Sequence, residues 1–364
     1  MKHKPFWLMP FALSLFAVPG CGSDDSDATP AGNCAIVDLG DGTSAIRCPD
    51  GSELVVRNGN DGEKGDKGDD GDQAACTLDE SEGKLTLTCG DQSVGIGDAC
   101  TEGFPADVYV AAGEADGAAS LLLFQVSNCT WVRGSVLIRD VDAIPELLSR
   151  IEKIDGSLEV YETGLEAVSL PNLTEVGSLY VGQNELIESV DFPALTKAGG
   201  LFIEDNAVIT DLAFPSLASV EHDLYIDGND GLTTVDAFAS VETIGGWLHF
   251  ANNPNLETVG NFTSLASVAG IELWNNETLV SVADFPALEE IAGFGEPIVG
   301  SLLYVANHLA LSSFGKLGSV STIDGDVTFE YNLELPQSDI DDLLDGIDIT
   351  GSQYICGNKG GPAC

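Results

Sequence analysis

The sequence predicts an all-β protein whose larger part is a β-solenoid, preceded by small disulfide-stapled β-hairpin units and a flexible N-terminal tether. A short apolar motif recurs over most of the chain at intervals of 21 to 25 residues, with one interval of 31. Between the motifs, apolar residues recur at every third position, as in Leu256, Val259 and Phe262. This spacing would wind around an α-helix, and the Pro of the recurring "FPAL" and "FPSL" segments disfavours a helix interior. Short extended segments joined by regular corners fit both observations.

Residues 1–20 read as an export signal. Lys2 and Lys4 precede an apolar stretch, 6–18, that is too short to span a bilayer. The tetrapeptide "VPGC" that ends at Cys21 resembles the bacterial lipobox, from which only Pro19 departs. The resemblance implies that Cys21 is acylated, and that Gly22 and Ser23 after it direct the lipoprotein to the outer membrane. Ordinary signal cleavage, which would leave a soluble protein, is the alternative.

Residues 21–33 form an acidic tether without apolar residues to pack. Two similar units follow at 34–58 and 74–99, and each alternates apolar and polar residues on both sides of a Gly, at Gly42 and Gly83. This pattern predicts β-hairpins. An even number of cysteines after Cys21 in an exported chain favours disulfides over metal ligands, and units this small need staples. Pairing between sequence neighbours predicts Cys34–Cys48 and Cys76–Cys89.

The segment between these units, 59–73, places Gly at every third position from Gly59 to Gly71. Only Gly fits the axis of a collagen triple helix, and the Lys-Gly-Asp triplets resemble those of bacterial collagen-like proteins. The segment has five such Gly and no Pro. A flexible acidic linker, or a loose Ca²⁺ chelator, is therefore the alternative to a trimerising collagen-like segment.

The solenoid is expected over 100–335. Its motif has the form φ-x-φ-x-x-N, and the copies begin at Val136, Leu158, Leu179, Leu201, Leu224, Leu248, Ile271, Leu302 and Val327. Such periods are typical of repeat architectures. A side-chain amide at the end of each strand can bond backbone groups of the turn, so stacked copies form a ladder. The predicted structural ladder comprises Asn184, Asn206, Asn229, Asn253, Asn276, Asn307 and Asn332.

The repeats resemble leucine-rich repeats and, more closely, the receptor L domain. The resemblance rests on Cys129, the segment "GSVLI" at 134–138, the helical "IPELLSRIEKIDGSLEV" at 144–160 and the later L-x-I/V-x-x-N units, and it covers about 129–335. It implies a right-handed β-solenoid of the kind found in growth-factor receptor ectodomains and fungal wall proteins. The unrelated N-terminal region gives a receptor-like signalling role no support.

Both ends of the solenoid are expected to be capped, since open sheet edges invite aggregation. A Cys100–Cys129 disulfide would close the first turn. In the cap at 336–364, Ser338 can N-cap a helix whose apolar face holds Ile340, Leu343, Leu344 and Ile347. A Cys356–Cys364 disulfide would hold the tail.

Charge and composition exclude several classes of function. The formal net charge of −45 repels phosphate backbones, so no nucleic-acid partner is expected, whereas basic partners and divalent cations would be attracted. The chain has no CxxC and only four His. We therefore predict no zinc or redox site and no cofactor, leaving only Ca²⁺ as a candidate ion.

A row of outward-facing side chains is the candidate binding site. The second strand position of each repeat points away from the core, and it holds Glu159, Tyr180, Phe202, Tyr225, His249, Glu272, Leu303 and Thr328. Four neighbouring repeats thus carry rings at Tyr180, Phe202, Tyr225 and His249. Glu204 and Asp227 lie two residues further along two of these strands, and Trp274 lies two residues after Glu272 in the next repeat. Exposed aromatic rings indicate a ligand-binding stripe. A stacking ladder that only stabilises the sheet is the alternative.

We therefore expect a surface-exposed bacterial lipoprotein whose solenoid is a recognition or adhesion module for a protein or a glycan. A passive cell-envelope spacer is the alternative. A polysaccharide-acting hydrolase could use paired carboxylates. However, 198–315 contains no Lys or Arg, which disfavours a lyase, and no Ser-His-Asp or Cys-His signature stands out. The sequence thus predicts that the protein is not an enzyme, and it leaves the oligomeric state open.

Overall fold

The computed structural model describes the backbone of six strands between residues 35 and 96, together with residues 103–111, 124–125, 127, 129–293 and 301–364. They belong to two compact units, one made of Met1–Thr101 with Ala111–Asn128 and the other of Glu102–Val110 with Cys129–Cys364. The expected signal at 1–20, Cys21, the tether and the G-x-y segment lie outside the described residues.

The first unit contains two three-stranded antiparallel sheets. The alternation around Gly42 and Gly83 produces the antiparallel pairs β1–β2 and β4–β5, and each pair gains a third strand that the hairpin prediction did not include. The strands are β1 (Ala35–Asp38), β2 (Thr43–Arg47), β3 (Glu53–Arg57), β4 (Cys76–Ser81), β5 (Lys84–Cys89) and β6 (Gln92–Ile96).

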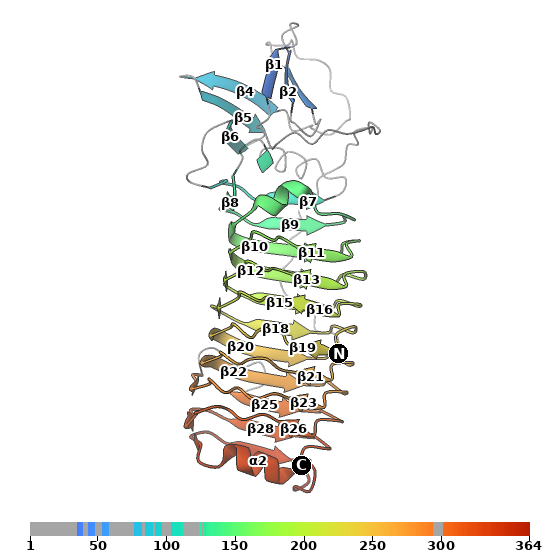
Figure 1. Ribbon diagram of the computed structural model, residues 1–364, viewed down its shortest axis with the longest axis vertical. Coiled ribbons are helices and arrows are strands. Elements are labelled where there is room, and N and C mark those ends of the chain that lie inside the picture. Colours follow the sequence, from blue (N-terminus) through green and yellow to red (C-terminus); the bar gives the residue numbers. More distant parts are fainter. Residues whose placement is uncertain are drawn as a thin grey trace, which may run out of the picture. The chain divides into compact units, whose positions relative to one another are not determined.

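The second unit is the predicted β-solenoid, with about 10 turns (Figure 1). Its central sheet is parallel, and the first apolar residue of each motif lies beside that of the next, as in Leu179, Leu201 and Leu224. The central strands are β7 (Val108–Ala111), β9 (Val136–Arg139), β10 (Lys153–Tyr161), β12 (Glu175–Gly182), β15 (Leu201–Glu204), β18 (Leu224–Asp227), β20 (Thr243–Ala251), β22 (Ser267–Trp274), β25 (Leu303–Ala306), β28 (Val327–Glu330) and β30 (Gln353–Cys356).

Two sets of shorter strands complete the turns. One set leads into the central sheet: β8 (Trp131–Val132), β14 (Lys197–Ala198), β17 (Ser219–Val220), β24 (Glu290–Ile291), β27 (Thr322–Ile323) and β29 (Asp348–Ile349). The other follows the central strands and forms two separate parallel sheets: β11 (Ala167–Ser169), β13 (Ser189–Asp191) and β16 (Asp211–Ala213), then β19 (Thr234–Val235), β21 (Thr258–Val259), β23 (Ser281–Val282) and β26 (Ser313–Phe314).

The core is filled by the apolar residues that recur at every third position. Leu256, Val259 and Phe262 are all buried, because each step of three residues carries the chain around a corner and returns a side chain to the interior. The Phe residues of the "FPAL" and "FPSL" corners (Phe192, Phe214 and Phe285) stack with Phe238 and Phe262, and neighbouring ring centroids lie 5.6–5.9 Å apart. Phe314 of β26 lies at the end of this stack, 6.5 Å from Phe285. The prolines lie in these corner turns, where no helix has to accommodate them.

A left-handed residue follows the central strand in ten turns. Its φ lies between 51° and 67° at Asp140, Glu162, Gln183, Asp205, Gly228, Asn252, Asn275, Asn307, Tyr331 and Gly357. The next residue turns into the core, and there the predicted Asn ladder is found. Asn206 is typical: its Nδ2 donates to Val181 O at 3.0 Å, and its Oδ1 accepts from the backbone N–H of Asn184 at 3.2 Å. The amides therefore satisfy backbone groups that the corner would otherwise leave buried and unpaired.

The copy at residue 302 is one residue out of register with the prediction. Leu303, not Leu302, pairs with Ile271 and Val327, so Tyr304 occupies the outward position that the prediction gave to Leu303. The ladder position is consequently held by buried His308, and Asn307 is the exposed left-handed residue before it. In the segment "SLLYVANH" the motif can begin at Leu302 or at Leu303. The strand begins at Leu303, so that Leu303 and Val305 point inward, although a start at Leu302 would put Asn307 at the motif's Asn position. Asn358 extends the ladder by one turn, bonding Asn332 Nδ2 at 3.1 Å.

Short helices replace a strand near both ends of the solenoid. The segment expected to be helical at 144–160 is helical only at η1, a 3₁₀-helix over Glu146–Arg150, and its remainder enters β10. The helix α2 (Gln337–Leu344) begins after Pro336, so Ser338 lies inside it and is not its N-cap. Of its expected apolar face, Ile340 is fully buried and Leu343 half-buried. Among the described residues, no helix has the length and apolar character needed to cross a membrane.

The cysteines are partly described. Cys356 and Cys364 form the predicted disulfide. Cys129 is also disulfide-bonded, but its expected partner Cys100 lies outside the described residues, as do Cys34 and Cys48. Cys76 and Cys89 stand directly opposite each other in the register of β4 and β5, although their side chains are not described. This register is compatible with the predicted Cys76–Cys89 disulfide, which stays a prediction.

Candidate functional site

The predicted ring-bearing residues are brought together on the outer face of the central sheet. Tyr180, Phe202, Tyr225 and His249 occupy the same position of β12, β15, β18 and β20, and we call these four residues the aromatic row. The Phe202 and Tyr225 ring centroids are 6.3 Å apart, and the Tyr225 and His249 rings stack at 3.9 Å. In-register parallel strands place equivalent side chains about 4.8 Å apart, so the contacts follow from the repeat.

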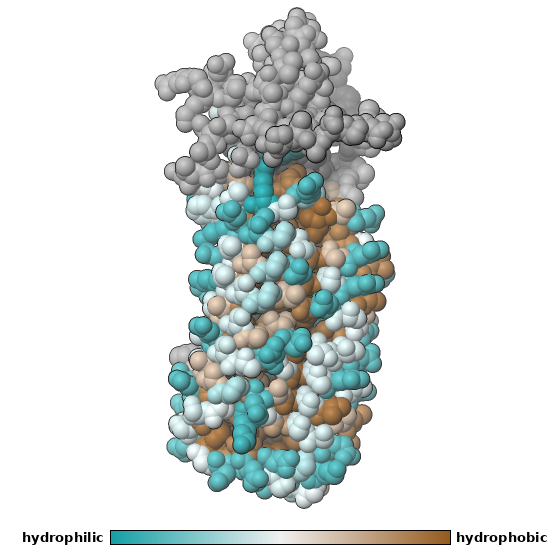
Figure 2. Space-filling view, in the orientation of Figure 1, coloured by the Kyte–Doolittle hydropathy of each residue, from teal (hydrophilic) through white to brown (hydrophobic). Residues whose placement is uncertain are grey.

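The row is less exposed than the sequence suggests. Tyr180, Phe202 and Tyr225 are half-buried, whereas His249 and Glu272 have no exposed surface. His249 therefore does not offer its ring to a ligand, and the prediction of four exposed rings is wrong at this residue. Trp274 meets the His249 ring edge-on at 6.1 Å and belongs to the same cluster. In the view of Figure 2, the surface of the solenoid is mainly hydrophilic, with hydrophobic patches among the hydrophilic residues.

Sequence reasoning missed Trp247, which lies two residues before His249 on the same strand. Its ring covers the Cα of Gly270 in the next turn, where an added Cβ would come within 2.0 Å of a ring atom, and only 5% of Trp247 is exposed. The period-two rule that selected the aromatic row could have found Trp247, because residues two apart on a strand share a face.

Asp227, His249 and Glu272 form a charged cluster. The Nε2 atom of His249 lies 3.3 Å from Asp227 Oδ2, and its Nδ1 atom lies 3.0 Å from Glu272 Oε2. Burial by itself lowers the pKa of His249, but hydrogen bonds with Asp227 and Glu272 outweigh it, so the pKa is raised. Because both ring nitrogens face carboxylates, the protonated imidazolium form of His249, which donates a hydrogen bond from each nitrogen, is favoured. With both nitrogens engaged, His249 is not arranged as a catalytic base.

Glu204 lies one turn from Asp227 in the same row of positions. Burial, followed by repulsion from Asp227 and Asp205, raises the pKa of Glu204 to about 7. Burial also raises the pKa of Tyr180 to about 12 and raises that of Tyr225, with nearby carboxylates adding to both effects. Near neutral pH the Glu204 carboxyl is therefore partly protonated and can donate as well as accept a hydrogen bond.

Replacing Glu204 with Gln should stabilise the protein at pH 8 and have a much smaller effect at pH 5. A raised folded-state pKa means that the folded protein is penalised once pH exceeds the unfolded value, and that the penalty is complete above the folded value. At pH 8 the Gln variant avoids this penalty, which we expect to be about 1–3 kcal/mol. Thermal unfolding of both proteins at the two pH values measures the difference. An effect of equal size at both would contradict the raised pKa.

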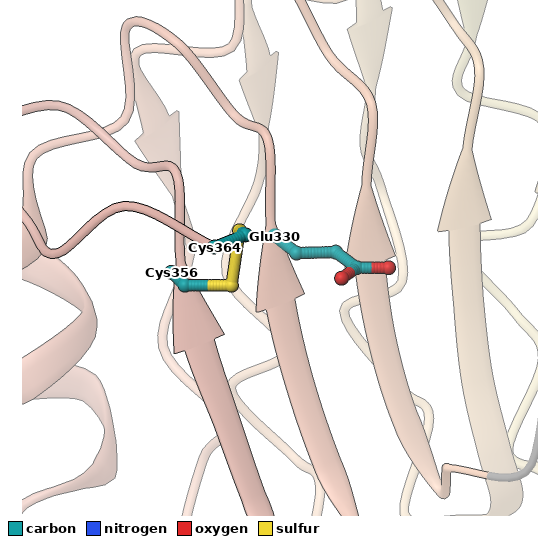
Figure 3. A group of neighbouring side chains, drawn as sticks. All are labelled: Glu330, Cys356 and Cys364. Atoms are coloured by element: carbon teal, nitrogen blue, oxygen red, sulfur yellow. A yellow bond between two sulfur atoms is a disulfide. The ribbon is translucent and has the colours of Figure 1, made fainter.

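The described residues include one group with metal-ligand types, namely Glu330, Cys356 and Cys364, whose donor atoms lie within 4.8 Å of one another (Figure 3). Metal binding by cysteine requires thiolates, and here both sulfur atoms are held in a disulfide. The Glu330 carboxylate accepts a hydrogen bond from Tyr304 at 3.0 Å. The group therefore does not fit a metal site in the oxidised protein.

The face thus combines three half-buried rings with an acid of raised pKa and a charged cluster that holds its geometry. It can stack on the apolar face of a ligand and bond its polar groups. His249, which is bonded at both nitrogens, is not free to activate a nucleophile. Asp227 likewise already accepts from Tyr225 and Asn252. Comparison with known proteins adds no functional assignment, because no protein-family model, curated protein or solved structure matches this chain.

Proposed function

We propose that this protein is a surface lipoprotein of the bacterial outer membrane whose solenoid is a recognition or adhesion module for a protein or a glycan. The observation that carries the proposal is the in-register series of half-buried rings at Tyr180, Phe202 and Tyr225, with carboxyl groups two residues further along two of these strands. A rigid sheet holds the rings at fixed spacing, so ordering them on ligand binding would cost little conformational entropy.

The resemblance to the receptor L domain belongs to the same proposal. The parallel solenoid with a buried amide ladder is compatible with that family, whose domains are parts of cell-surface proteins. The G-x-y segment at 59–73 would then act as a collagen-like or flexible spacer between the anchor and the solenoid. Neither a cofactor nor catalysis enters this proposal, and Ca²⁺ remains a candidate for the acidic segment.

The aromatic row is tested with the double variant Tyr180→Ser/Tyr225→Ser. If the rings bind a partner, the variant should lose binding, since truncating central interface anchors commonly costs about 2 kcal/mol or more each. The core residues Leu179 and Leu224 are unchanged and fully buried, so the solenoid should still form. Binding to candidate glycans and envelope proteins, measured by surface plasmon resonance alongside thermal unfolding, separates the two effects.

Tyr354→Ser provides the matched control, because Tyr354 occupies the equivalent outward position of β30, far along the solenoid, and is 54% exposed. We expect it to bind as wild type does. A Tyr180/Tyr225 variant that unfolds earlier, by about 1 kcal/mol per lost ring contact, but binds its partner like wild type would leave only the stacking-ladder role.

The lipid anchor predicts a second result. Cys21→Ser should abolish incorporation of radiolabelled fatty acid and release the protein from the membrane fraction, because the thiol is the acylated group in the lipobox reading. The far-UV circular dichroism of the released protein should match that of wild type. If the wild-type protein in its native host takes up no labelled fatty acid, ordinary signal cleavage replaces the lipoprotein proposal.

Two other functions compete with recognition. A passive envelope spacer would require neither the rings nor the raised pKa of Glu204. A polysaccharide hydrolase is favoured by the proximity of Glu204, with its pKa of about 7, to a second carboxylate. That second group, Asp227, is already bonded to His249, Tyr225 and Asn252, so it is not free for catalysis. Release of reducing sugar from polysaccharides would establish the hydrolase instead.

A further inference from the structure

A groove of about 770 Å³ runs along the corner that follows the central strands in the C-terminal half of the solenoid. One row of its lining residues is the left-handed position of four consecutive turns: Asn252, Asn275, Asn307 and Tyr331. The other row lies two residues further along and includes Pro254, Glu277, Leu309 and Leu333. Each turn thus presents the same pair of positions to the groove.

The two ends of the groove differ in chemistry. At one end Leu309, Tyr331 and Leu333 are 53%, 47% and 51% exposed, so this apolar surface is open to solvent. At the other end the amides form a bonded chain, in which Asn275 Nδ2 donates to Asn252 Oδ1 at 3.2 Å and Asn252 Nδ2 donates to Asp227. This chain fixes the orientation of the Asn252 amide, because both its amide nitrogen and its oxygen are engaged.

Tyr331 adds an independent observation. It has a φ of 55°, and a bulky side chain rarely adopts this conformation, which glycine adopts freely. The equivalent residues of two other turns are Gly228 and Gly357. The other left-handed corner residues are Asp, Glu, Gln, Asn or Gly, so Tyr331 is the one aromatic residue among these ten positions, and its side chain lines the groove while 47% exposed. An aromatic ring exposed at this position is available to stack on a ligand.

We infer that this corner groove binds an uncharged, linear polysaccharide along the axis of the solenoid. Turns of parallel sheet repeat about every 4.8 Å, close to the advance of one pyranose unit in an extended chain. Successive sugars would therefore meet equivalent side chains, with the C–H face of a pyranose on Tyr331 and hydroxyl groups on the amides. The lining has two carboxylates, Asp230 and Glu277, and no cationic side chain, which disfavours an anionic polysaccharide.

An extended peptide fits the groove less well. Peptides that add to a sheet gain their affinity from unpaired backbone groups. Here the backbone N–H groups of Asn252, Asn275 and Asn307 already donate to the neighbouring turn, at 3.0–3.2 Å. At these three residues the corner groove therefore offers a ligand side chains, but no unpaired backbone N–H groups. This inference does not rest on the aromatic row, which lies on other residues of the central strands.

The test uses the full chain and a panel of defined hexasaccharides of glucose, mannose, xylose and N-acetylglucosamine, with hexagalacturonate as the anionic probe and hexalysine as the peptide probe. Isothermal titration should detect at least one neutral hexasaccharide, which binds at least 10-fold more tightly than its disaccharide. Tyr331→Gly and Leu309→Ser should each weaken this binding at least 10-fold. The Gly variant should at the same time unfold at a temperature no lower than wild type, because it relieves the left-handed conformation.

Glu162→Gly is the matched control, since it makes the same backbone change at the equivalent position outside the groove. It should retain full affinity, as should the Tyr180→Ser/Tyr225→Ser variant, so failure here and failure of the aromatic row are distinguishable. The inference is overturned if no neutral hexasaccharide binds, if only hexalysine or hexagalacturonate binds, or if both groove variants bind like wild type.

Discussion

Replacing Asn229 with alanine is expected to lower the free energy of unfolding by about 3–5 kcal/mol. Asn229 is fully buried at the centre of the amide ladder. Its Nδ2 donates to Ile203 O at 2.9 Å, and its Oδ1 accepts from the backbone and the side chain of Asn206 at 3.3 and 3.0 Å. Truncation leaves several buried polar groups without a partner, and each costs about 1–3 kcal/mol. Urea denaturation followed by circular dichroism measures the loss.

Asn255→Ala is the control for this experiment. Asn255 is an exposed amide that also bonds a backbone oxygen of the preceding turn, Asp230 O, at 2.8 Å. Water can replace that bond, so we expect a loss of less than about 1 kcal/mol. Equal losses in the two variants would mean that burial of the ladder does not determine its contribution.

Phe238→Ala should produce a loss of similar size for a different reason. Phe238 is fully buried between Phe214 and Phe262, with ring centroids 5.6 and 5.7 Å away. Removing the ring forfeits its transfer free energy and leaves a cavity, which together cost about 3–5 kcal/mol in protein cores. The stack continues on both sides, so neighbouring turns cannot close the gap without losing their own ring contacts.

Phe238→Leu separates packing volume from ring stacking. Leucine fills most of the space, and we expect a loss of about 1–2 kcal/mol, measured in the same denaturation series. Small and similar losses for the Ala and Leu variants would indicate that the turn collapses around the site. That result would contradict a rigid interior. A thermal scan of the Ala variant should show an earlier transition in parallel.

The outward positions illustrate where sequence and structure part. The period-two rule correctly aligned Tyr180, Phe202, Tyr225 and His249 on one face, because the direction of a side chain on a strand is a local property. It could not tell that His249 is fully buried while Tyr225 is not. His249 is covered by the rings of Tyr225 and Trp274 and by the carboxylates of Asp227 and Glu272, all from adjacent turns. The raised pKa of Glu204 has the same origin, since its causes lie in the burial of the site and in Asp227 one turn away.

The sequence by itself determined the solenoid, the turn length, the buried amides and the C-terminal disulfide. Each turn carries its own alternation, its apolar corners and its Asn, so these features are written within some two dozen residues. Only the tertiary structure decided the register after the long interval, where His308 rather than Asn307 enters the ladder. It also decided the Asp227–His249–Glu272 cluster and the corner groove. These features arise between turns, where the lateral fit of side chains more than twenty residues apart selects among registers that local spacing leaves open.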